Sequence, residues 1–569
     1  MKKTFIQAVV LSLVGTTASS AWAVDAIYFG GDILTMRGES PEYVEALAVD
    51  QGKIASVGNK EKVLTLKTST TKLINLQGKT LIPGFIDGHG HITQYADALE
   101  QAELSPPPVG KVESIPDIIR ELKALQKRLN IQDDQVIIGS GYDPEFLKEK
   151  RHPTAAELDA VFPKNPVILR HVSGHMLVAN SLALKAANIS AQTPDPSGGT
   201  IVRKPGSKEP EGLIQETAMV PFLPMVITKR AMTKEMSLLK QAMMDYAKVG
   251  VTTANEALVT PEKMEVLDYA AKNNLLSIDI VGLPFYLMAD QVLGTGKVKW
   301  QEYNGGLKYA GLKIALDGSP QGKTAFLTED YLTPVPGCTG HCHGFPNMTQ
   351  DEVNQVFIKA YKNKVQIYAH CNGDASTDMM IKGHQFAEKQ LKTPGIERRT
   401  VIVHSQVMRP DQLNSYKKFN FYPTFFTNHT YFWGDIHLAN LGQKRASFLS
   451  PMKSAKQKGL KFANHNDAPV TPISQLFVLW SSVNRVSKNG VVVGPQERVS
   501  PYVGLQALTS YGAYQYRDEA IKGTLEAGKL ADMVVLDANP LKVDPMKIKD
   551  IQVLRTIKSG KEIYKSSSL

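Results

Sequence analysis

The stretch LIPGFIDGHGH at residues 81–91 decides the fold of this chain, because it is an apolar run that ends in two histidines. Four later runs also carry a histidine, lysine or aspartate: GLKIALDG (311–318), VQIYAH (365–370), TVIVHS (400–405) and LKFANHND (460–467). Each has the length of a strand buried on both faces. In a closed barrel of parallel strands, all carboxyl ends open on one face. The sequence therefore predicts an α/β barrel in which one pocket gathers these side chains.

The polar side chains of these runs form a candidate metal site. In an extended segment His89 and His91 share a face, so both imidazoles can reach one cation. A histidine that closes a buried strand can also be a hydrogen-bonded core residue. The convergence of five runs favours ligation over that alternative. The six predicted ligands are His89, His91, Lys313, His370, His404 and Asp467.

Lys313 needs chemical modification before it can bind a metal, because an ammonium group has no lone pair. An amine that burial deprotonates can take up carbon dioxide, and the resulting carbamate offers an oxygen ligand that can bridge two metals. The alternative is an unmodified lysine that pairs with Asp317 or with a substrate anion.

Asp467 is expected at the mouth of the pocket, because Ala468-Pro469 follows it and stops the strand. There its carboxylate can bind metal and exchange a proton with water. The alternative role is a helix N-cap or a turn residue. The neighbouring His465 and Asn466 are then supporting partners of the ligands or surface residues of the same turn.

The composition describes an ordinary globular protein with an export signal. The chain has 569 residues, 43% of them hydrophobic, and a formal net charge of +10. The basic residues are scattered, which argues against nucleic-acid binding. Residues 1–23 contain Lys2 and Lys3, an uncharged apolar stretch and the pattern Ala21-Trp22-Ala23, as in a secretory signal peptide. We expect export to the periplasm, with secretion as the second choice and an uncleaved anchor as the alternative, and no stable membrane insertion after cleavage.

Three cysteines exclude a dense disulfide framework. Cys338 and Cys342 lie in GCTGHCHG, where the intervening residues allow a tight turn and a disulfide. A second metal site that also uses His341 and His343, or an unpaired loop, are the alternatives. Cys371 is interpreted as a small residue of the pocket wall, with an extra ligand or an oxidation site left open.

The order of apolar runs predicts an interrupted domain organisation. Residues 24–82 and 511–569 read as short strands between turns, and we expect them to build one small β-sandwich from both chain ends. The barrel then spans residues 83–510, with an insertion at about 95–245 over its mouth. Helical spacing appears at residues 116–130 and 233–250.

These motifs together resemble the metal-dependent amidohydrolase superfamily. The resemblance rests on PGFIDGHGH, on Lys313 to Gly318, on the strand-end His370 and His404, and on Asp467-Ala-Pro-Val. Five further segments are similar to the branch that contains N-substituted formamide deformylases: GYDPEFL (141–147), SGHMLVANSLAL (173–184), DPSGGTIV (195–202), LDGSPQGKTAFL (316–327) and EAGKLADMVVLD (526–537).

The resemblance implies a (β/α)8 TIM-type barrel with a small β-sandwich and one or two divalent ions, usually zinc. It implies that His89, His91 and Asp467 hold one ion, that His370 and His404 hold the other, and that carboxylated Lys313 bridges them. Asp467 would act as general base and then general acid while a metal-bound hydroxide attacks a carbonyl.

Two further residues match branch motifs outside the ligand set, His175 and Tyr142, and they are candidates for contacting the substrate. The chain departs from the family pattern at Cys371-Asn372, where relatives have a small residue, and at His465-Asn466, where they have Gly-Ser. These departures affect the polarity of the pocket and leave the ligands in place.

The predicted function is hydrolysis of a C–N bond in a small amide or N-substituted formamide by an exported enzyme. An esterase, lactonase or dipeptidase on the same site is a second hypothesis, and a non-catalytic metal- or solute-binding protein is a third. Keeping six costly polar groups in one pocket argues against the third. The oligomeric state is open, with a homodimer as one option.

Overall fold

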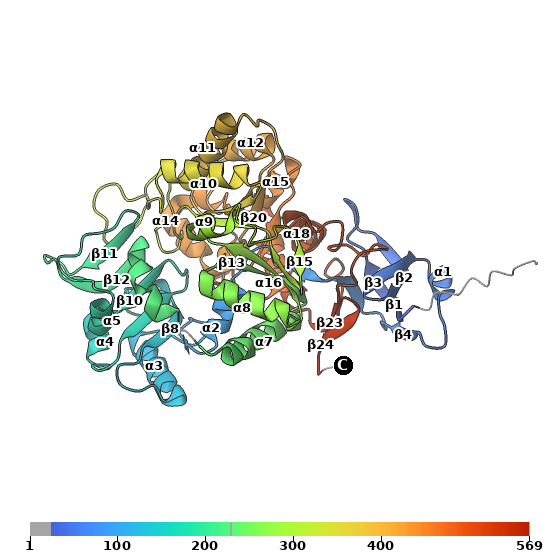
Figure 1. The fold of residues 1–569 in the computed structure, drawn as a ribbon, viewed down its shortest axis with the longest axis horizontal. Coiled ribbons are helices and arrows are strands. Elements are labelled where there is room, and N and C mark those ends of the chain that lie inside the picture. Colours follow the sequence, from blue (N-terminus) through green and yellow to red (C-terminus); the bar gives the residue numbers. More distant parts are fainter. Residues whose placement is uncertain (1–23, 228–229, 568–569) are drawn as a thin grey trace, which may run out of the picture.

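The computed structural model describes residues 24–227 and 230–567. The predicted signal peptide at residues 1–23 lies outside these described residues. Within them, none of the helices combines the length and the apolar character that crossing a bilayer needs. Figure 1 shows an α/β centre between two peripheral sheets, one blue and red and the other teal.

Both ends of the chain meet in one eight-stranded sheet. β5 pairs antiparallel with β22, so that Ile82 lies opposite Val534, and this pairing joins residues from the two ends of the sequence. The pairings define a single sheet, and the predicted two-layered sandwich therefore stays a prediction. The strands of this terminal sheet are β1 (Ala26–Leu34), β2 (Tyr43–Asp50), β3 (Lys53–Gly58), β4 (Lys72–Asn75), β5 (Thr80–Pro83), β22 (Met533–Leu536), β23 (Val553–Lys558) and β24 (Lys561–Lys565).

The run at residues 81–91 is not one strand, which corrects the expectation from its apolar character. It divides at Gly84 into β5 of the terminal sheet and β6 (Phe85–Ile86), which pairs with β13. A Cβ atom at Gly84 would overlap the side chain of Thr252, so glycine lets the chain pass between the two sheets. The sequence pattern shows that both parts are buried, but not that different sheets bury them.

Parallel strands at eight successive positions form the centre of the molecule. Ladders join β6, β13, β14 and β16 (Leu307–Tyr309), and separately β17 to β21; β16 leads into β17 through Ala310, so these two share one position. A parallel bridge between Phe285 and Lys313 connects the two groups, and Gly88, just after β6, lies against Ala463 of β21. The strands are β6, β13 (Val251–Val259), β14 (Asp279–Pro284), β17 (Gly311–Ala315), β18 (Gln366–Cys371), β19 (Val401–His404), β20 (Tyr422–Phe425) and β21 (Ala463–Asn464).

Helices cover the outside of these strands and contribute to the largest hydrophobic cluster. Local signals explain where they begin: Thr349 and Glu352 form a capping box at α10, and Pro261 opens α8 after the cap Thr260. The helices that lie between or after the parallel strands include α7 (Met232–Lys248), α8 (Pro261–Lys272), α10 (Gln350–Lys362), α11 (Asp374–Leu391), α12 (Pro410–Phe419), α14 (Gly434–Ala446), α15 (Met452–Gln457), α16 (Gln475–Asn484), α17 (Pro501–Leu508) and α18 (Ser510–Gln515).

A six-stranded sheet occupies residues 102–216, between α2 (Ile92–Ala98) and α7. Figure 1 shows it on the side of the centre that faces away from the terminal sheet. The helix expected at 116–130 is α3 (Ile115–Leu129), and the one expected at 233–250 is α7. The strands are β7 (Ala102–Glu103), β8 (Ile137–Tyr142), β9 (Val167–His171), β10 (Met176–Ala179), β11 (Gly199–Arg203) and β12 (Pro210–Glu216).

A buried histidine in α11 predicts an acid-sensitive step in stability. Burial, with a smaller effect of Arg398, lowers the pKa of His384 from 6.5 to about 4; Glu388 and Tyr361 also face its ring. The unfolded state therefore binds more protons between these two values. The stabilising contribution is complete above about pH 6.5 and is lost as the pH falls towards 4. The loss amounts to about 3 kcal/mol.

We expect His384→Gln to weaken this pH dependence. The measurement is the midpoint temperature of unfolding at about pH 7 and about pH 4 for both proteins. The parent should lose more stability on acidification than the variant does. Equal losses would show that His384 is not responsible.

Candidate functional site

The structure brings the six predicted ligands to one end of the parallel strands. His404 ends β19, His370 is the second-last residue of β18, and Asp467 follows β21. Lys313 is the third of five residues of β17, so it lies within its strand and not at the end. All six are buried except His91, whose side chain is 14% exposed.

His89 and His91 lie in the loop that connects β6 to α2, and not in the extended strand that the sequence suggested; His91 forms an isolated bridge with Glu256. Gly90 permits the close approach of this loop to Asp87, because a Cβ atom there would meet the carboxylate. Both imidazoles still face Asp467: Nε2 of His89 is 3.3 Å and Nε2 of His91 is 3.5 Å from its Oδ1 atom. One ligand atom from each of these three residues lies within 4.8 Å of the others, which suits a single cation.

The other predicted ligands adjoin this group. The Lys313 amine is 3.3 Å from Nε2 of His89. The ring of His404 is centred 5.1 Å from that of His89 and 4.5 Å from that of His370. Asp467 reaches the same histidine, with Oδ2 4.0 Å from Nε2 of His404. The six side chains therefore form one continuous cluster.

The charge states in the cluster fit a cation. Burial lowers the pKa values of His89, His370 and His404, and the positive neighbours lower them further. These histidines are therefore neutral, which is the form that binds metal. Burial alone would raise the pKa of Asp467, but the ring of His91, with Nε2 3.5 Å from Oδ1, outweighs it and holds the pKa low. Burial lowers the pKa of Lys313 to about 7.

Buried polar atoms that lack a hydrogen-bond partner also indicate a cation site. Buried polar atoms are normally hydrogen-bonded, because leaving them without a partner costs free energy. Within the described part of the chain, five such atoms of the cluster and of the adjoining His465 lack a hydrogen-bond partner: Nδ1 of His89, Nδ1 of His404, both ring nitrogens of His465, and Oδ1 of Asp467. A divalent ion bound by nitrogen and carboxylate oxygen suits such a set of donors.

Carboxylates behind the ligands fix their rings. Oδ1 of Asp317 is 3.2 Å from Nδ1 of His370, and Oε1 of Glu256 is 3.7 Å from Nδ1 of His91. Asp317 is itself held by the backbone N–H groups of Asn372 and Gly373. Such partners orient a ligating imidazole and increase its basicity. On the sequence alone, Asp317 is a candidate partner of Lys313 and nothing more. Glu256 is not identified from the sequence, although it is a charged residue inside the strand-like run VTTANEAL.

A family model described as "Amidohydrolase family" matches residues 72–564. The chain belongs to the amidohydrolase family. It is 26% identical over 524 residues to the N-substituted formamide deformylase of Arthrobacter pascens, covering 91% of this chain and 94% of the relative. It is also 27% identical over 567 residues to the protein LONG AFTER FAR-RED 3 of Arabidopsis thaliana, covering 97% and 94% of the two chains.

Among solved structures, this amidohydrolase is similar to an uncharacterized metal-dependent hydrolase from Pyrococcus horikoshii OT3. The TM-score is 0.71 at 22% identity, with 91% of this chain and 99% of the other covered. The structural neighbours of the family imply a TIM-type α/β barrel, to which the eight parallel strands correspond. Family and site together support a metal-dependent hydrolase that uses divalent metal.

His465 of this amidohydrolase is a buried neighbour of the metal ligands. Its ring is centred 5.1 Å from those of both His89 and His404, and its side chain has no solvent exposure. The surface location that the sequence left open is therefore wrong. Burial lowers the pKa of His465 to about 3, so the ring is neutral. One of its nitrogens can then donate a hydrogen bond in the pocket and the other can accept one. Asn466 is also buried, and its amide donates to Gln475.

The two candidate substrate contacts lie in different places. His175 is next to the ligands, with its ring centred 4.9 Å from that of His370. Tyr142 belongs to a separate aromatic group, where its hydroxyl lies 3.0 Å from Nδ1 of His152 and its ring is edge-on to His171. Among the described residues, no contact of Tyr142 with the six ligands is recorded. Its role as a substrate contact stays a prediction.

The cysteines take structural positions in the amidohydrolase. Cys338 and Cys342 form a disulfide, so the alternative metal site at these residues is set aside. Cys371 is buried, its thiol contacts the carbonyl oxygen of Ser376, and burial raises its pKa. A protonated, enclosed thiol is a poor ligand and a poor target for oxidation. Cys371 belongs to the largest hydrophobic cluster, together with Ile367 and Ala369 of the same strand, and its place in the pocket wall stays a prediction.

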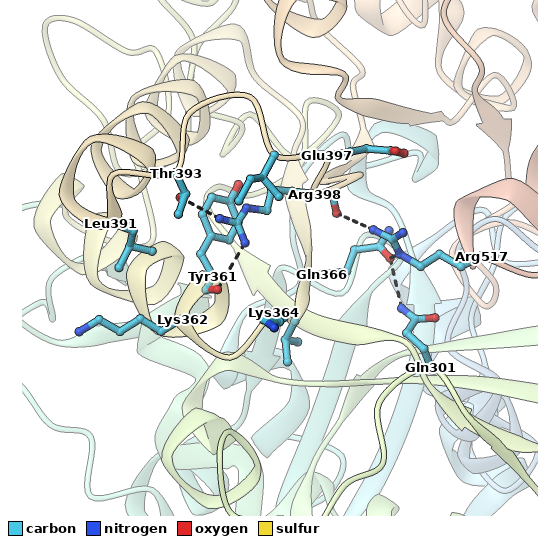
Figure 2. Close-up of a pocket in the computed structure, with 12 residues that line it drawn as sticks. Gln301, Tyr361, Lys362, Lys364, Gln366, Leu391, Thr393, Glu397, Arg398 and Arg517 are labelled. Atoms are coloured by element: carbon cyan, nitrogen blue, oxygen red, sulfur yellow. Dashed lines mark hydrogen bonds between the residues drawn. The ribbon is translucent and has the colours of Figure 1, made fainter.

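A separate cleft of about 430 Å³ lies at the opposite end of β18 from His370. Gln366, the first residue of that strand, lines it together with Arg398 and Arg517 (Figure 2). The two arginines are engaged within the wall: Arg517 donates to Gln366 and to a backbone carbonyl, and Arg398 donates to Thr393. This cleft is therefore not part of the metal site.

Proposed function

We propose that this protein hydrolyses the carbon–nitrogen bond of a small amide or N-substituted formamide. The observation that carries the proposal is the convergence of four imidazoles, one carboxylate and one lysine amine at the end of a parallel barrel. The relative from Arthrobacter pascens, named a formamide deformylase, supports this substrate class. A divalent ion held by these residues would supply activation of water and of a carbonyl group.

Residues of the chain would bind the ions, transfer the proton and orient the ligand rings. His89, His91 and Asp467 would hold one ion, and His370 and His404 would hold a second. We favour zinc, because neutral imidazole and carboxylate are ligands that zinc prefers. Asp467, ionised at neutral pH, would accept a proton from the attacking water and then donate it to the leaving nitrogen. Asp317 and Glu256 would keep the ligand rings in place.

Lys313 is proposed to carry a carbamate. Its amine lies inside the ligand cluster, and no carboxylate is recorded within ion-pairing distance of it among the described residues. The amine nitrogen would form a bond to the carbon of carbon dioxide and lose a proton, giving a carbamate anion. The new oxygen atoms would serve as the bridging ligand that an ammonium group cannot supply.

The test is a hydrolysis assay with purified mature protein and a panel of N-substituted formamides, simple amides and matched esters. We expect release of amine from the formamides or amides, its loss after treatment with a chelator, and its recovery after zinc is added back. Release of alcohol from the esters alone would assign the site to ester hydrolysis. No turnover by protein of known metal content would refute the proposed activity.

A further inference from the structure

The peripheral sheet at residues 102–216 delivers a histidine–carboxylate pair to the metal site. His175 directly precedes β10, Glu216 ends β12, and these strands pair antiparallel with Met176 opposite Gln215. The two side chains therefore leave the sheet at the same end. Nδ1 of His175 lies 2.9 Å from Oε2 of Glu216, and the His175 ring contacts that of His370. A sheet outside the barrel thus completes the wall of the site.

The structure holds the Glu216 carboxylate firmly. Its side chain is only 2% exposed, and Oε2 also accepts a hydrogen bond of 3.2 Å from the amide of Asn347. Glu216 has φ 51° and ψ −125°, a conformation that L-residues rarely adopt. Such a conformation persists only where the surroundings enforce it, and it is concentrated at functional sites. Gly318, in the loop after β17, leaves the space that the carboxylate fills, since a Cβ atom there would overlap Oε1.

The hydrogen bond to Glu216 sets the orientation of the His175 ring. The Glu216 carboxylate accepts a hydrogen bond from Nδ1–H of His175. Nε2 lies on the opposite side of the ring, and in this tautomer it is free to accept a hydrogen bond from another group. The side chain of His175 is 20% exposed, ten times the exposure of Glu216, and no partner of Nε2 is recorded among the described residues. His175 is therefore the member of the pair that a ligand can reach.

We propose that Glu216 is a positioning residue that fixes His175 so that its Nε2 atom hydrogen-bonds the reacting amide group of the substrate beside His370. This inference rests on the proposed amide hydrolysis and extends it, because it makes the peripheral sheet part of the catalytic centre. Glu216 acts through His175 and does not itself reach the substrate.

The kinetic test uses Glu216→Met, Glu216→Gln, His175→Ala and the double variant Glu216→Met/His175→Ala. Misplacing a group that orients the substrate costs about 10²-fold, so we expect that loss in kcat for Glu216→Met and for His175→Ala. Glu216→Gln should retain most of the activity, because its amide oxygen can still accept from Nδ1. In the His175→Ala background, Glu216→Met should cause no further loss, since residues that act as a unit are not additive.

Glu388→Gln is the matched control, because Glu388 also faces a buried histidine, His384, but in α11 and away from the site. It should leave kcat unchanged. Independent losses that multiply in the double variant would overturn the proposal. So would full activity in Glu216→Met.

A second readout does not depend on turnover. Nuclear magnetic resonance of protein containing isotope-labelled histidine, with the His175 signal assigned from His175→Ala, reports which ring nitrogen carries the hydrogen. We expect Nδ1–H in the parent and in Glu216→Gln, and a shift to Nε2–H in Glu216→Met. An unchanged tautomer in Glu216→Met would refute the positioning role. If the parent hydrolyses no amide, the proposed function fails, whereas the tautomer still decides whether Glu216 orients His175.

Discussion

Asp467→Asn is expected to lower kcat for amide hydrolysis by about 10²- to 10⁴-fold, the range that proton transfer by a positioned side chain contributes. The substitution keeps an oxygen atom that can face His89 and His91 but removes the ability to accept and return a proton. Metal content should stay at the level of the parent, because the four histidines and Lys313 remain. The measurements are steady-state kinetics and elemental analysis of the same preparation.

Asp411→Asn is the control for this change, because Asp411 lies on the surface with its side chain 67% exposed, and its ion pair among the described residues is with Arg409. It should leave both kcat and metal content unaltered. Loss of metal together with activity in Asp467→Asn would assign the residue to ligation alone. Unchanged turnover would place the proton transfer elsewhere in the pocket.

Lys313→Ala is expected to lose at least one metal ion per chain and to lose turnover as well. The amine is buried within the ligand cluster, and without it no bridging oxygen ligand can form. Elemental analysis of protein purified without chelator measures the stoichiometry. Labelled bicarbonate should give a carbamate carbon signal in the parent that is absent from the variant.

Two further variants separate this effect from general damage to the fold. Lys313→Met preserves the length of the side chain but lacks the amine, so it should lose the ion as Lys313→Ala does. Lys382→Ala removes an exposed lysine from α11 and should retain parental metal content. Full metal content and activity in Lys313→Met would show that no carbamate is needed.

The residue pattern alone was sufficient to identify some of the buried strands, with two histidines near their carboxyl ends. VQIYAH and TVIVHS fall in β18 and β19, with the histidine second-last in β18 and last in β19, because a continuous β-branched and apolar run is stable only where both faces are covered. The helices α3 and α7 begin within two residues of the predicted starts, since spacing and end signals are local properties.

Only the tertiary structure decided which distant residues act together. The sequence does not reveal that Glu256 stands behind His91, that Glu216 holds His175, that Tyr142 lies with His152, or that the run at residues 81–91 serves two sheets. Periodicity and turn signals report the conformation of neighbouring residues. Partners from separate strands meet only when the whole barrel and its peripheral sheet pack, so their pairing is a property of long-range contacts and not of any single stretch.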